Sequence, residues 1–118
     1  MFVKRILMYI KCNIEVTLNQ GGNKYFVRLL ELDPLKNDVL DGQWIENDSY
    51  GFTSKPVVKL VEFMFPFSEV GEFYPELQIL IFSEAGEKVY ESEINKDFSF
   101  FELNDVEKLT IDFKSVSL

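Results

Sequence analysis

The sequence contains no histidine and a single cysteine, Cys12, and these shortages exclude several kinds of chemistry. Without histidine there is no conventional Ser–His–Asp or Cys–His arrangement and no histidine-ligated metal. One cysteine allows neither an internal disulfide nor a cysteine-rich zinc site, so we expect Cys12 to be a buried core residue. No glycine-rich stretch runs into a lysine and a helix, as a phosphate-binding loop requires. A carboxylate pair of the glycosidase type stays open, but it needs a sugar-holding cleft that a small β-domain rarely provides. We therefore expect a protein that is not an enzyme and holds no cofactor or metal.

Long apolar runs are also missing. No segment approaches the roughly 18 apolar residues that a membrane-spanning helix needs. The N-terminal segment is apolar only from Ile6 to Ile10, which is short for a secretion signal, and no small-residue cleavage site follows. We therefore expect a soluble, cytoplasmic protein. Its 118 residues, 47 % of them hydrophobic, fit one domain spanning 1–118 with an ample core.

The stretch Ile6–Leu18 shows the strongest pattern in the chain. Its even-numbered positions are all apolar, and from Tyr9 onward the odd-numbered ones are mostly polar. Because successive side chains of a strand point to opposite faces, this alternation predicts a long β-strand with one buried face. A strand of this length is expected to bend, to carry a bulge or to contribute to two sheets. The turn residues Asn19–Asn23 and the alternating stretch Tyr25–Leu30 then predict an antiparallel hairpin.

Further short strands follow at close spacing. Val57–Phe67 is apolar on both faces and ends near Pro66, which predicts a central strand or one that reaches an interface. Leu77–Phe82 and Lys88–Ile94 flank a turn and predict a second hairpin, and Leu109–Phe113 alternates cleanly. A short strand is also expected at Phe98–Phe101. Seven to eight strands with at most one helical turn predict an all-β fold, an antiparallel β-sandwich or open barrel.

Residues 33–55 are the least regular part of the chain. Leu35–Leu40 could form one helical turn after Asp33 and Pro34, and Gln43–Glu46 a short strand. The oxygen-rich side chains of this segment either form ordinary turns or bind calcium, although they lack EF-hand spacing; they are Asp33, Asp38, Asp41, Asn47 and Asp48. Its aromatic residues Trp44, Tyr50 and Phe52 either cap the core or contact a sugar or a protein partner.

Negative charge is concentrated in the second half of the chain. Residues 60–118 carry a net charge of −9, from four lysines and thirteen carboxylates, within a total of −8. Such an asymmetry disfavours binding to nucleic acid or anionic lipid and favours a basic partner, although it also occurs on simply solvated surfaces. We expect partner contacts from Glu69, Glu72, Glu76, Glu84, Glu87, Glu91, Glu93 and Asp97, with Trp44 and Tyr50 as aromatic anchors.

Small size, a β-rich pattern, the acidic hairpin and the alternating last strand Leu109–Phe113 resemble the bacterial immunity proteins of contact-dependent and polymorphic toxin systems. The resemblance is one of class and carries no position-specific motif. It implies stoichiometric inhibition, in which an acidic face covers the active site of a basic, nuclease-type toxin in place of substrate phosphates.

Two other functions remain open. One is a carbohydrate- or ligand-binding β-sandwich that uses Trp44, Tyr50 and Phe52. The other is an assembly or adaptor subunit that pairs through the edge of Val57–Phe67. An immunity protein should bind one basic partner in a salt-sensitive way, whereas a sugar binder should tolerate charge reversal and fail with Trp44→Ala. The oligomeric state is left open by the sequence.

Overall fold

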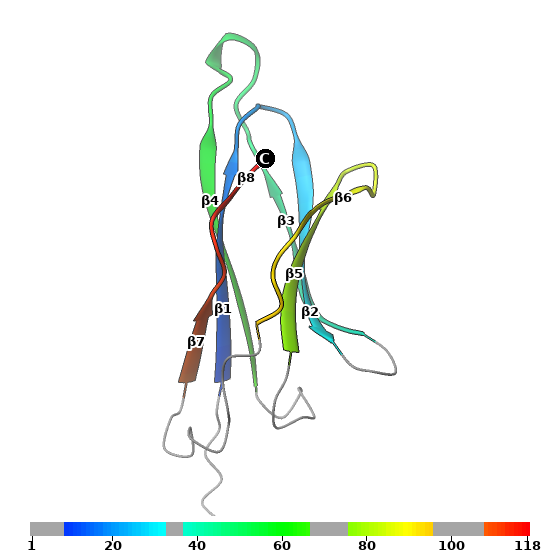
Figure 1. Cartoon of the computed structure of the whole chain (residues 1–118). Coiled ribbons are helices and arrows are strands. Elements are labelled where there is room, and N and C mark those ends of the chain that lie inside the picture. The colour runs from blue at the N-terminus through cyan, green and yellow to red at the C-terminus, as the bar shows by residue number, and fades with distance from the viewer. Residues whose placement is uncertain (1–8, 33–36, 67–75, 96–107) are drawn as a thin grey trace, which may run out of the picture.

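The computed structural model describes residues 9–32, 37–66, 76–95 and 108–118, which form two facing β-sheets (Figure 1). The first sheet has the order β4-β1-β7, with β8 also pairing with β1, and the second has the order β3-β2-β5-β6. A single 3-10 turn (Gly51–Thr53) is the only helical element of the described residues. The strands are β1 (Tyr9–Leu18), β2 (Lys24–Leu32), β3 (Asp38–Glu46), β4 (Val57–Pro66), β5 (Glu76–Ser83), β6 (Lys88–Glu91), β7 (Lys108–Asp112) and β8 (Val116–Ser117).

The predicted all-β sandwich is confirmed, and the sheets do not close into a barrel. One feature departs from a purely antiparallel arrangement, since β7 and β8 both run parallel to β1. The chain leaves the second sheet after β6 and enters the first sheet at β7, beside β1. A strand that is reached by such a crossover, rather than by a hairpin, is free to lie parallel to its neighbour.

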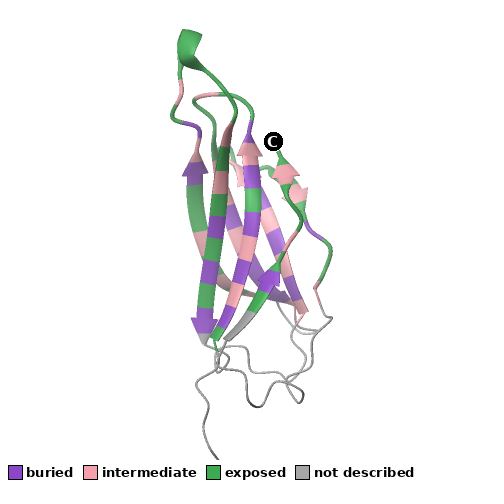
Figure 2. Cartoon of the chain, turned by 90° about the vertical axis from the view of Figure 1, so that its left-hand side faces the viewer, coloured by how far each residue is buried: buried purple, intermediate pink, exposed green. Residues whose placement is uncertain are grey.

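Strand β1 lies in the middle of the first sheet and has the alternating burial that the sequence predicts (Figure 2). Its inward side chains are at most 1 % exposed; they are Ile10, Cys12, Ile14, Val16 and Leu18. The pairing with β4 runs without a register shift over all ten residues, so of the three alternatives expected for this strand, neither the bulge nor the sharing between two sheets is found within the described part of β1. On its other side two shorter strands, β7 and β8, pair with it in succession.

The predicted hairpin of β1 and β2 is wrong, because the two strands belong to different sheets. The turn between them is an arch that places their apolar faces against each other across the core (Figure 1). An alternating pattern and a glycine turn fit a hairpin and an arch equally well. Here β1 and β2 form their backbone hydrogen bonds with other strands rather than with each other. Gly21 is required in the arch because a Cβ at this position would overlap the backbone carbonyl of Ser49.

The predicted helical turn over Leu35–Leu40 is also wrong where it can be compared, because residues 38–40 begin β3. β3 pairs with β2 from Asp38 to Glu46, with one register shift beside Leu29 and Leu30. The open edge of β2 supplies backbone partners to this segment, and sheet pairing overrides its weak local preference for a helix. The expected strand Gln43–Glu46 is confirmed as the last part of β3.

Strand β4 has the buried face and the Pro66 end that the sequence predicts, but it is an edge strand rather than a central one. Its inward residues Val61, Phe63 and Phe65 are buried. Its outward residues Val58, Leu60 and Met64 are 54–59 % exposed.

The predicted second hairpin is confirmed as β5 and β6, and Leu109–Phe113 is confirmed in its main part as β7. The loop 68–75 and the strand predicted at Phe98–Phe101 lie outside the described residues.

Cys12 lies fully inside the core, as predicted. Burial, together with the charge of Asp112, raises the pKa of the thiol to about 12 from an ordinary 9.0. The native thiolate population at a given pH below 9 should therefore be about 1000-fold lower than in the unfolded chain. We expect a disulfide reagent to label Cys12 only in denaturant, whereas labelling of the native protein at the unfolded rate would contradict this placement.

Because the thiol of the unfolded chain loses its proton at a lower pH than the native thiol, the contribution of Cys12 to stability is present below pH 9 and declines from pH 9 toward 12.

Candidate functional site

The described members of the predicted binding set lie in four places. Glu69, Glu72 and Asp97 fall outside the described residues. Glu76 begins β5 at the end of the strand opposite the β5–β6 turn, and Tyr50 lies in the loop between β3 and β4. Trp44 lies on β3. The remaining four occupy the β5–β6 hairpin and its exit, and we call them the acidic hairpin; they are Glu84, Glu87, Glu91 and Glu93.

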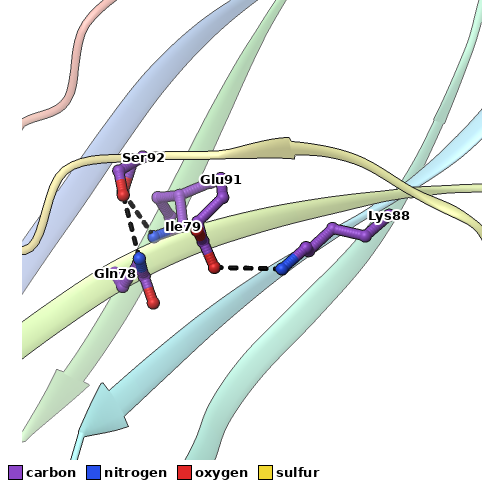
Figure 3. Close-up of polar contacts among 5 residues, drawn as sticks. All are labelled: Gln78, Ile79, Lys88, Glu91 and Ser92. Atoms are coloured by element: carbon purple, nitrogen blue, oxygen red, sulfur yellow. Dashed lines mark hydrogen bonds and ion pairs between the residues drawn. The ribbon is translucent and has the colours of Figure 1, made fainter.

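Backbone and serine hydrogen bonds fix the shape of the acidic hairpin (Figure 3). The buried Ser92 accepts a hydrogen bond at Oγ from the Ile79 amide at 2.9 Å, and its carbonyl accepts one from Gln78 Nε2 at 2.9 Å. At the turn, the Ser83 amide donates to the Glu87 carbonyl at 2.8 Å, and Gly86 adopts a φ of 89°. The carboxylates are therefore carried on a defined hairpin that is tied to the central strand β5.

Cations neutralise the acidic hairpin only in part. Lys88 Nζ lies 3.1 Å from Glu91 Oε1, and Lys114 Nζ lies 3.9 Å from Glu93 Oε2 with both side chains more than 80 % exposed. Residues 76–95 contain five glutamates and one lysine, a net charge of −4. Exposed ion pairs of this kind contribute at most about 1 kcal/mol each, so they restrain the carboxylates little. The surface keeps a negative potential that favours a cationic partner.

The exit of β6 departs from the strand predicted over Lys88–Ile94, because β6 ends at Glu91. Tyr90 is half-buried, but Ile94 is 40 % exposed and the buried position between them is Ser92. Regular pairing ends at Glu91, after a register shift between Ile81 and Phe82, and beyond it the chain bonds β5 through Ser92 and through the bridge of Asn95 with Leu77. Burial raises the pKa of Tyr90, with a further contribution from the Glu93 carboxylate.

A hollow of about 260 Å³ lies where the exit of β6 meets the end of β7. Glu91, Glu93 and Asp112 line it together with Lys114, so it joins carboxylates from both sheets. Asp112 also accepts a hydrogen bond from Asn13 Nδ2 at 2.9 Å. The sequence analysis missed Asp112, because its nearness to the hairpin depends on the parallel pairing of β7 with β1.

Trp44 lies on the outer face of the second sheet and is 56 % exposed. Its ring meets Phe26 edge-on at 5.2 Å between centroids. A second hollow, of about 330 Å³, is lined by Lys24, Trp44, Ile45, Glu46 and Glu84. Two predicted contact residues from distant parts of the sequence, Trp44 and Glu84, therefore line the same depression.

The structure does not bring Tyr50 and Phe52 into that hollow. Both are exposed in the β3–β4 loop, where Tyr50 faces Gly22 of the arch and Phe52 is fully exposed at the 3-10 turn. Of the three aromatic residues named for a sugar or protein contact, only Trp44 therefore lines this hollow. The three residues are close together in the sequence. However, β3 ends at Glu46, so Trp44 lies on the sheet whereas Tyr50 and Phe52 lie in the loop.

Asn47, one of the proposed calcium ligands, has a structural role. It is fully buried, and its Nδ2 donates to the carbonyls of Leu18 and Lys55 at 2.9 and 2.6 Å. Its Oδ1 accepts from the Ser49 amide at 3.0 Å. Asp33 lies outside the described residues, and within the described ranges no three His, Cys, Asp or Glu side chains gather closely enough to hold a metal ion.

Among the residues that the structure describes, no helix is long and apolar enough to span a membrane. The acidic hairpin and the hollow beside Trp44 are thus the candidate functional surfaces. No protein-family model, curated protein or solved structure matches this chain.

Proposed function

We propose that this protein is an immunity-type inhibitor that binds a basic protein partner, a bacterial toxin domain, through its acidic hairpin. The observation that supports the proposal best is the net charge of −4 on residues 76–95, carried by a hairpin that Ser92 and Ser83 fix in shape. Four exposed carboxylates on a hairpin of defined backbone shape provide electrostatic complementarity to a basic surface, and the backbone that carries them need not be ordered on binding.

The proposed mechanism is occlusion without catalysis by this chain. Carboxylates of the acidic hairpin occupy positions that substrate phosphates take in a nuclease-type active site, and long-range attraction raises the association rate. The hollow beside Trp44 receives an apolar side chain of the partner, which slows dissociation because buried aromatic contacts dominate most interfaces. Glu84 belongs to both surfaces and joins them into one interface.

A carbohydrate-binding sandwich is the second candidate, and the 330 Å³ hollow with an exposed tryptophan and two carboxylates favours it. Sugar rings stack on such tryptophans, and carboxylates accept hydrogen bonds from sugar hydroxyls. The two functions respond differently to mutation. Charge reversal at Glu87, outside the hollow, should leave sugar binding intact and weaken binding to a basic protein.

The test begins with capture of partners on the immobilised protein, followed by co-expression of the captured protein in a bacterial host. We expect a basic protein that stops growth, and full protection when the wild-type chain is co-expressed. The double variant Glu84→Lys/Glu87→Lys should lose about 100-fold or more in affinity, since close charge pairs across interfaces couple by about 1.5 kcal/mol or more each. Its binding should also weaken less steeply with added salt.

The matched control is Glu15→Lys/Asp48→Lys, which makes the same change of charge at exposed positions outside the acidic hairpin. It should bind and protect like the wild type. Equal losses in the two double variants would show that only net charge matters. A captured partner whose toxicity is unchanged by co-expression would contradict the proposal.

A further inference from the structure

The outer face of the second sheet carries an unusual set of side chains for a face that meets solvent. We call it the aromatic face and define it by Phe26 and Arg28 of β2, Trp44 of β3 and Phe82 of β5. In the register of the sheet, Phe26 is opposite Trp44 on one side and Phe82 on the other. Arg28 comes next along β2, between Gly42 and Leu80.

The guanidinium of Arg28 is held between two rings. Its Cζ lies 5.5 Å from the centroid of Phe26 and 4.9 Å from that of Phe82, within the range of a cation–π contact. Its Nε is buried and has no hydrogen-bond partner among the described residues. Ring faces attract the charge but accept none of the hydrogen bonds that the five N–H groups can donate.

The lysines beside Arg28 differ from it in this respect. Lys24 lies 3.9 Å from Glu46, and Lys88 lies 3.1 Å from Glu91, so each has a carboxylate of its own. Among the residues that the structure describes, Arg28, at the centre of the face, contacts only the two rings in this way. Arg28 is therefore a fixed cation without a hydrogen-bond acceptor for its Nε among the described residues, and the neighbouring lysines are already paired with carboxylates. Such a site is complementary to a single carboxylate rather than to a polyanion.

Gly42 leaves the space that the ring of Phe26 occupies on the aromatic face. A glycine inside a strand weakens the strand, and β3 nevertheless has one opposite Arg28. A Cβ on Gly42 would overlap the ring of Phe26. The absence of a side chain therefore seats the ring that flanks the guanidinium and packs against Trp44.

We propose that the aromatic face binds a protein segment that presents an aspartate or glutamate carboxylate to Arg28 and apolar side chains to Trp44 and Phe82. Trp and Arg in a partly desolvated cluster are the typical composition of an interface hot spot, and carboxylate is the acceptor that matches a planar guanidinium. Glu84, which lines the neighbouring hollow, adds a negative charge that disfavours polyanions such as nucleic acids and polyuronic sugars. Because Trp44 also lines the hollow assigned to the basic partner, the two partners would occupy this tryptophan in turn.

The test uses a phage-displayed library of random twelve-residue peptides, panned on the full chain. Trp44 is the only tryptophan, so its emission reports directly on occupancy of the aromatic face. We expect enriched peptides that contain Asp or Glu, and a change in Trp44 emission as each synthetic peptide is titrated. Replacing the peptide's acidic residue by its amide should weaken binding about 10- to 100-fold, as expected for a charge-assisted hydrogen bond.

Arg28→Gln should produce the same loss for the parent peptide and no further loss for the amide peptide, while Arg28→Lys should fall between them. Lys88→Gln is the matched control and should retain affinity. If Arg28→Gln fails to fold, the amide peptide on the wild-type chain still decides the question. The proposal is overturned if no peptide is enriched, if acid and amide peptides bind equally, or if oligogalacturonate changes Trp44 emission and the peptides do not.

Discussion

Replacing Asn47 by alanine should lower the free energy of unfolding by about 3 kcal/mol, because the buried carbonyl of Leu18, the part-buried carbonyl of Lys55 and the Ser49 amide would each lose a hydrogen bond at once. The carbonyl of Leu18 at the end of β1 and that of Lys55 before β4 both accept from Asn47 Nδ2. The backbone of Asn47 also bonds the arch, through the Gly22 amide at 2.8 Å and the Asn23 carbonyl at 3.3 Å. The side chain of Asn47 therefore ties the end of β1 to the β3–β4 loop, while its backbone bonds the arch.

Urea unfolding followed by circular dichroism measures this effect. Asp48→Ala is the control next in sequence, at an exposed position, and should change the free energy of unfolding by less than about 0.5 kcal/mol. Asn47→Asp should also destabilise the fold, because it replaces the two Nδ2 donors by a buried carboxylate. A loss below about 1 kcal/mol for Asn47→Ala would contradict the role assigned to this residue.

Ile14→Ala should cost about 3 to 4 kcal/mol, the range for deleting a large aliphatic side chain from a packed core. Ile14 is 1 % exposed in the middle of β1, beside Val61 of β4. Since small domains are stable by about 5 to 15 kcal/mol, the variant should fold but melt at a much lower temperature.

Glu15→Ala tests the alternation of β1 one position further along the chain. Its side chain is exposed on the outer face, so the change should be within about 0.5 kcal/mol. Calorimetric melting of the two variants against the wild type provides the comparison. Similar losses at Ile14 and Glu15 would contradict the assignment of even-numbered residues to the core.

Much of the strand content follows from the sequence because alternation depends only on local geometry. The even-numbered residues of β1, the buried face of β4 and the turn between β5 and β6 were all predictable in this way. The partner of each strand was not. The glycine turn after Leu18 suits a hairpin as well as an arch, and the choice depends on β4 and β3 occupying the neighbouring edges.

The candidate sites also differ in whether local sequence or strand pairing brings their residues together. Glu84, Glu87, Glu91 and Glu93 follow one another closely in the chain, so their clustering was predictable from local sequence. Arg28 was missed, because its contact with Phe82 depends on the pairing of β2 with β5 across more than fifty residues. Asn47 was assigned to a turn or to calcium, since the pattern of oxygen-bearing side chains does not reveal which of them is buried.

The most direct test of the proposed function is a map of amide hydrogen exchange on the chain, free and bound to the captured basic partner. Binding through the acidic hairpin predicts slowed exchange at the β5–β6 turn and at the exit of β6, with the exposed face of β4 and the β3–β4 loop unchanged. Protection confined to β4 or to that loop, with the acidic hairpin exchanging as in the free protein, would contradict the account.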